Sequence, residues 1–224
     1  VNGTALTFST ADGDAVVEKM RITHAGLVGI GTSVPTELFE LEQSTAGTTT
    51  RLKIDNQENG NAASHSELLL STGGASGGDA MIRYNNRVTN FTMGLDNDGD
   101  VFRICNSNGD LSSNARLTML ENGRVGIGTT APGEQLDVES TASGNAIRVR
   151  NTNADASSSR FIFSKDSSSP ADGDNLGQFE WYGDDDGGTA TQFGEIRVLS
   201  ADVTNGTEDG SMFLQTMVGG SAVD

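Results

Sequence analysis

The chain has 224 residues, of which 34% are apolar and 5% aromatic, and its formal net charge is −17. With so few large apolar side chains, one copy has difficulty burying enough surface to offset its ordering entropy, so we expect several copies to share their burial. Nucleic acids and anionic membranes are bound through Lys and Arg, so a polyanion of this kind is expected to bind neither. The longest apolar run, Leu68–Leu70, is too short for membrane insertion.

Short apolar runs recur along the chain with the two-residue alternation of β-strands, and no stretch has the 3.6-residue period of a long helix. Asp-Gly and Asn-Gly pairs between these runs favour tight hairpins. The sequence therefore predicts an all-β fold. Beyond the first Gly-Ile-Gly segment, the expected strands cover residues 50–55, 66–71, 80–84, 90–95, 100–105, 115–120, 145–150, 160–164, 177–182, 194–200 and 211–217.

Alternate residues of these strands are expected to face a core, because successive side chains of a strand point to opposite faces. In the first half of the chain these are Leu68, Leu70, Ile82, Phe102, Ile104, Leu117 and Met119. In the second half they are Ile147, Val149, Phe161, Phe163, Phe179, Trp181, Ile196 and Val198. Cys105 is the only cysteine and is expected to be a small buried apolar residue.

One segment is written twice. Residues 27–42 read LVGIGTSVPTELFELE and residues 124–139 read RVGIGTTAPGEQLDVE, an ungapped match at a fixed offset. A long fixed period is typical of a modular array. We expect the end of a preceding module in residues 1–25 and two modules in 26–122 and 123–224, with the array cut at both ends. Residues 213–224 resemble the start of a further hairpin.

The repeat resembles one found in shaft regions of bacteriophage tail-fibre and virion-fibre proteins and in related bacterial surface fibres. Residues 123–138 carry its full pattern, Gly-x-Val-Gly-Ile-Gly-Thr, two residues, Pro, three residues, then Leu-Asp-Val. The first copy departs from it only at Phe39, Glu40 and Leu41. Many such fibres end in an intramolecular chaperone, whose sequence is not among these residues.

The resemblance implies an elongated β-rich homotrimer in an extracellular virion fibre, with neighbouring fibre or virion proteins as partners. It would be a structural shaft that projects a distal receptor-binding tip. Glycine in a strand costs about 0.5–1 kcal/mol and marks a close backbone approach. We therefore expect nodes where three chains meet, formed by Gly29, Ile30, Gly31, Pro35, Gly126, Ile127, Gly128 and Pro132.

Alternatives to a shaft rest on fewer residues. Trp181, Tyr182 and Asp184 could contact a host surface glycan, as in a receptor-binding or glycan-binding adhesin. A polysaccharide depolymerase would need paired carboxylates, and none is singled out. The glycine loops precede a proline instead of a helix, which disfavours dinucleotide binding. We assign no catalytic residue, cofactor or metal site and expect no enzyme, although a weak Ca²⁺ site at Asp96, Asp98 and Asp100, or at 184–186, stays open.

Overall fold

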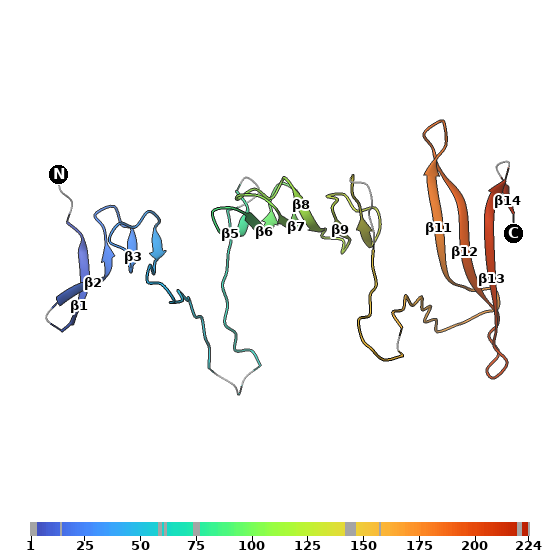
Figure 1. The fold of residues 1–224 in the computed structure, drawn as a ribbon, viewed down its shortest axis with the longest axis horizontal. Coiled ribbons are helices and arrows are strands. Elements are labelled where there is room, and N and C mark those ends of the chain that lie inside the picture. Colours follow the sequence, from blue (N-terminus) through green and yellow to red (C-terminus); the bar gives the residue numbers. More distant parts are fainter. Residues whose placement is uncertain are drawn as a thin grey trace. The chain divides into compact units, whose positions relative to one another are not determined.

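The computed structural model describes residues 4–13, 15–57, 60, 62–73, 77–141, 147–156, 158–218 and 221–223. Within these residues the fold is all-β, as predicted, with strands in three separate sheets (Figure 1). The chain divides into two compact units, Val1–Thr141 and Ala142–Asp224. Over the described part of the chain, no helix has the length and apolar character needed to cross a membrane.

The first sheet contains β1 (Leu6–Asp12), β2 (Ala15–Ile22), β3 (Val28–Ile30) and β4 (Phe39–Leu41) in that order. The first three strands are antiparallel neighbours, whereas β4 runs parallel to β3. Parallel neighbours usually need a crossover of a dozen or more residues. Here residues 31–38 suffice, so the chain makes a tight wrap and returns beside itself.

The second sheet is a six-stranded ribbon that ends in the same wrap. Four antiparallel strands are followed by a short strand and its parallel neighbour. The strands are β5 (Ala80–Asn85), β6 (Asn90–Asp96), β7 (Val101–Cys105), β8 (Ala115–Met119), β9 (Val125–Ile127) and β10 (Leu136–Val138).

The third sheet is an antiparallel meander of β11 (Asn175–Asp184), β12 (Ala190–Asp202), β13 (Asp209–Val218) and β14 (Ser221–Val223). Its last hairpin pairs Val218 with Ser221, just as the first hairpin of the chain pairs Asp12 with Ala15. The hairpin expected from residues 213–224 is therefore present, although its turn residues 219 and 220 and residue 224 lie outside the described residues.

Four predicted strands are wrong for a single copy of the chain. Residues 50–55, 66–71, 147–150 and 160–164 are assigned to no strand, and residues 145 and 146 lie outside the described residues. The alternation of apolar and polar residues indicates that a segment suits a pleated, half-buried surface. A strand also needs a hydrogen-bonding neighbour. The other seven predicted strands match β5, β6, β7, β8, β11, β12 and β13 within a few residues.

The residues predicted to face a core are not buried within one copy of the chain. Ile82 is 38% exposed, Met119 46% and Trp181 53%, and none of the described residues predicted for the core is buried. Among the described residues, the buried apolar side chains are Val101, Cys105, Leu111 and the two prolines Pro35 and Pro132, which confirms the expectation for Cys105. The alternation located a common apolar face correctly in the strands that form, but the described part of the same copy leaves most of that face exposed.

Candidate functional site

The two repeated segments fold into one structure, which we call a node: residues 19–42 in the first copy and 116–139 in the second. The strand registers coincide, with Gly29 opposite Arg21 and Glu40 in the first and Gly126 opposite Thr118 and Asp137 in the second. The backbone hydrogen bonds that close the node recur as well. Gly31 N donates to Lys19 O at 3.0 Å, and Gly128 N donates to Arg116 O at 3.2 Å. Glu42 N donates to Ile30 O and Glu139 N to Ile127 O, both at 2.9 Å.

Contacts within one chain explain the node glycines. A Cβ on Gly29 would lie 2.8 Å from the carbonyl oxygen of Thr32, and one on Gly126 would lie 2.6 Å from that of Thr129. These separations are shorter than van der Waals contact, so the wrap requires glycine at both sites. Pro35 and Pro132 are buried and lie against the same two positions.

Gly31 and Gly128 are required for a second reason. Their φ angles of +79° and +81° lie in the left-handed region, where a side chain is strained. A Cβ at either site would also collide with the carbonyl oxygen of Glu42 or Glu139. The close approach that we expected between different chains is therefore supplied inside each chain, and a meeting of three chains at the nodes stays a prediction.

A carboxylate caps the wrap in each node. Glu40 accepts hydrogen bonds from the backbone N–H of Thr36 at 2.7 Å and from its hydroxyl at 3.0 Å. Asp137 accepts one from Gly133 N at 2.9 Å at the equivalent place. The bonds from the Thr36 backbone and then its hydroxyl hold the pKa of Glu40 below its ordinary value. This carboxylate was not selected from the sequence, although its spacing to residue 36 recurs in the second copy.

The first node is expected to loosen in acid. Because folding lowers the pKa of Glu40, its stabilisation is present above the unfolded pKa, near 4.5, and is lost as pH falls through the folded value. The amide NMR shift of Thr36 should titrate with a midpoint below 4.5, and Glu40→Gln should remove that titration. The Gly133 amide of the second node is the internal control, since Glu40→Gln should leave it unchanged. A Thr36 midpoint at or above 4.5 would contradict the cap.

One face of the second sheet is apolar across every strand. Paired residues of neighbouring strands share a face, so the registers place fourteen side chains together. None of the fourteen is buried, and Leu95 and Leu136 are 55% and 60% exposed. We call this the open face of the sheet; its residues are Ala80, Ile82, Tyr84, Phe91, Met93, Leu95, Phe102, Ile104, Leu117, Met119, Val125, Ile127, Leu136 and Val138.

The other two sheets have an open face of the same kind. In the first sheet it consists of Leu6, Phe8, Met20, Ile22, Val28, Ile30, Phe39 and Leu41. In the third it includes Phe179, Trp181, Ile196, Val198, Met212 and Leu214. Soluble monomers rarely expose a contiguous apolar patch larger than a few hundred Å². Three such faces in one chain are candidate interaction surfaces.

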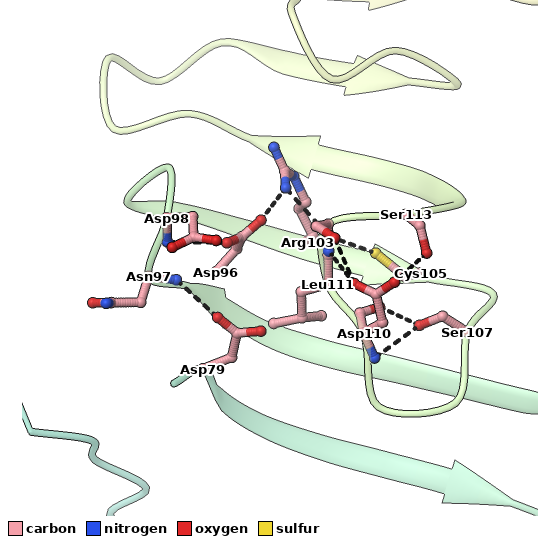
Figure 2. Close-up of polar contacts among 11 residues, drawn as sticks. Asp79, Asp96, Asn97, Asp98, Arg103, Cys105, Ser107, Asp110, Leu111 and Ser113 are labelled. Atoms are coloured by element: carbon pink, nitrogen blue, oxygen red, sulfur yellow. Dashed lines mark hydrogen bonds and ion pairs between the residues drawn. The ribbon is translucent and has the colours of Figure 1, made fainter. Parts of the chain in front are cut away.

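The opposite face of the second sheet holds a small polar core under residues 106–114 (Figure 2). The carboxylate of Asp96, only 3% exposed, forms an ion pair with Arg103, whose guanidinium also donates to the Leu111 carbonyl at 3.2 Å. The thiol of Cys105 donates to the same carbonyl at 3.3 Å, and burial raises its pKa. Residues 106–114 therefore cover the face of the second sheet that carries Asp96 and Arg103, and the open face on the other side stays largely exposed.

The aspartate-rich turns are occupied by internal hydrogen bonds. Asp96 accepts the backbone N–H of Asp98 at 3.1 Å in addition to its ion pair (Figure 2). Asp185 accepts those of Gly187 and Thr189, both at 2.9 Å. Within the described residues, no three His, Cys, Asp or Glu side chains are grouped as metal ligands. These contacts account for the aspartates as turn-forming residues, and neither Ca²⁺ site is proposed further.

The three candidate glycan contacts do not converge. Trp181 belongs to the open face of the third sheet and borders a hollow of about 360 Å³ with Phe193 and Leu214. Tyr182 follows it directly in β11, so its side chain lies on the opposite face, as does that of Asp184. Both aromatic side chains are more than half exposed. The structure thus offers an apolar platform at Trp181 without the two polar neighbours.

Seven carboxyl groups of the described residues have a shifted pKa. Those with a shifted pKa are all shifted downward by hydrogen bonds from nearby donors, whereas the general acid of a glycosidase needs a raised pKa. They are Glu18, Glu40, Asp55, Asp110, Asp174, Asp202 and Glu208. The absence of enzymatic activity stays a prediction.

The chain was also compared with known proteins. No protein-family model matches it, and no curated protein matches its sequence.

Proposed function

We propose that this chain is a structural shaft segment of a homotrimeric fibre, of the kind that projects a receptor-binding tip from a virion. The observation that carries the proposal is the open apolar face, which recurs on all three sheets and which the described part of the chain leaves largely uncovered. The resemblance of the repeat to phage fibre shafts supplies the threefold symmetry and the location outside the cell.

Further copies of the same chain are the occupants that fit these faces. A single small partner would cover one sheet, but the faces recur along the chain with the nodes, from Leu6 to Leu214. When a second copy runs parallel and in the same register, each open face meets the equivalent open face of that copy. The remaining surface is strongly acidic, since the net charge of −17 is repeated in every copy, and this favours contact through the apolar faces alone.

Native mass spectrometry tests the assembly. We expect a species of three times 23.3 kDa that persists at micromolar concentration. Exposed apolar faces should also bind a dye such as ANS in any dissociated chain and lose that binding on assembly. A folded monomer with a cooperative melting transition would overturn the proposal, because it would show that the faces need no cover.

Glycan binding is a second candidate function, favoured by the half-exposed Trp181 beside its open hollow. The variant Trp181→Ala distinguishes the two functions. A shaft role predicts a lower melting temperature of the assembly and no glycan affinity in either protein. A glycan site predicts that the wild-type assembly binds oligosaccharides on an array and that Trp181→Ala assembles normally but loses this binding.

A further inference from the structure

Each node is followed by a linker with the same two-part pattern. The first arm covers residues 50–55 in one linker and 147–150 in the other. The second arm reads SELLLS at 66–71 and SRFIFS at 159–164, three successive apolar residues between two serines. The node, linker and antiparallel sheet thus follow one another in the same order twice, and the linkers are part of the repeat (Figure 1).

The arms have the composition of strands but no strand neighbour in their own chain. Among the described residues, no backbone-to-backbone hydrogen bond involves either second arm. Leu69 is 72% exposed and Ile162 71%, each between two further apolar residues. Because neighbours in an extended chain point to opposite sides, a run of three apolar residues suits a strand that is buried on both faces.

One side of each second arm already lies against the open face of its own sheet. The ring of Phe163 contacts that of Phe179 edge-on at 5.0 Å between centroids. Gly177 makes room for it, since a Cβ there would lie 2.6 Å from the Cβ of Phe163. In the other linker, Leu70 lines a hollow with Ala80 and Leu95 of the open face. The other side, at Leu69 and Ile162, has no cover.

A hairpin of the two arms within one chain does not meet this need. Asn56 donates to the Ser66 hydroxyl at 2.7 Å and to the His65 carbonyl at 3.2 Å, so the arms meet at the end of their loop. Beyond that point, no backbone hydrogen bond joins the described residues of the two arms. A lone two-stranded hairpin is marginal in water and would leave one side of Leu69 exposed.

We infer that each second arm becomes a β-strand by pairing through its backbone with the first arm of a neighbouring copy. The inference rests on the proposed homo-oligomer and specifies where its chains interlock. The neighbouring copy supplies both missing components: hydrogen bonds for the unpaired backbone and an apolar layer over Leu69 and Ile162. The sheets then associate through side chains and the linkers through main-chain hydrogen bonds.

Hydrogen exchange on the assembled protein tests this pairing. Amides of residues 67–71 and 160–164 should exchange at least about a hundredfold more slowly than in an unstructured peptide of the same sequence. The amide of Asp186, in an exposed turn, should stay fast, and those of β12 should be slow. A trimer by mass whose second arms exchange freely would overturn the inference and leave the shaft proposal standing. A folded monomer would overturn the shaft proposal and the inference together.

Cysteine pairs distinguish chains that interlock from chains that lie side by side. Leu52→Cys with Leu70→Cys, oxidised in the assembly, should give covalent dimers and trimers on a denaturing gel. The control is Asp184→Cys with Ala190→Cys, at paired positions of β11 and β12, which should close within one chain and migrate as monomer. Native Cys105 is fully buried and does not compete. Monomer bands in which the thiols at 52 and 70 have been consumed would mean an intrachain hairpin and would overturn the inference.

Discussion

Replacing Leu95 by lysine is expected to abolish assembly. Leu95 lies in β6 on the open face of the second sheet and is 55% exposed in a single copy, so the isolated chain tolerates the change. In the proposed trimer the same position is covered, and an unpaired buried charge costs about 3–5 kcal/mol. Three copies place three such charges at one level of the fibre. Native mass spectrometry should show monomer where the wild-type chain gives trimer.

Val88→Lys is the matched control for this prediction. Val88 is also an exposed apolar residue, at 88%, but it lies in the turn between β5 and β6 and not on the open face. It gains the same charge at a site that stays in water, so its assembly and melting temperature should match the wild type. If Leu95→Lys also assembled and melted as the wild type does, the open face would not be an interface.

Gly126→Val is expected to destabilise the second node by about 1–3 kcal/mol, the usual cost of overpacking. The new Cβ would lie 2.6 Å from the Thr129 carbonyl oxygen, so the backbone of the wrap must move. The gain in strand propensity, at most about 1 kcal/mol, does not offset this. Because the crowding atoms belong to the same chain, thermal unfolding should show the loss in dissociated chains as well as in the assembly.

Gly210→Val is the control glycine. It lies in β13, and the nearest atom to an added Cβ is the Leu199 carbonyl oxygen at 3.8 Å, an ordinary contact. The melting temperature of Gly210→Val should therefore stay close to that of the wild type, as expected for a surface substitution. Gly194 is less suitable, since a Cβ there would lie 3.2 Å from the Gln215 carbonyl oxygen. Equal melting temperatures for Gly126→Val and Gly210→Val would refute the intrachain explanation of the node.

Much of the fold could be predicted because strand alternation is local. Phe102, Ile104, Leu117 and Met119 were correctly placed on one face by their spacing alone. Whether anything covers that face is not encoded in the alternation. The four arms were predicted as strands from the same local signal: SELLLS has the composition of a strand, but composition does not supply a hydrogen-bonding neighbour, and the described part of the chain provides none.

The node shows a different limit of sequence reasoning. Its glycines were correctly recognised as sites of close backbone approach, but the approaching atoms were assigned to other chains. The parallel pair β3–β4 and its short connection make Thr32 and Pro35 the actual neighbours of Gly29. A parallel return over so few residues is unusual, so local propensity does not suggest it. The repeat could have indicated the cap, since Glu40 and Asp137 occupy equivalent positions.

Because each node is closed by bonds among its own residues, it affects how a chain of this kind can change length during evolution. Every bond that closes the wrap joins residues between 19 and 42, or between 116 and 139, and the two sets are interchangeable position by position. Recombination between the two coding segments, joining Gly29 directly to Ile127, would delete one whole module and still leave an intact node at the junction. The reciprocal product would gain a module. Recombination at the node can therefore shorten or lengthen the protein by whole modules, and the fold at the junction stays that of an ordinary node.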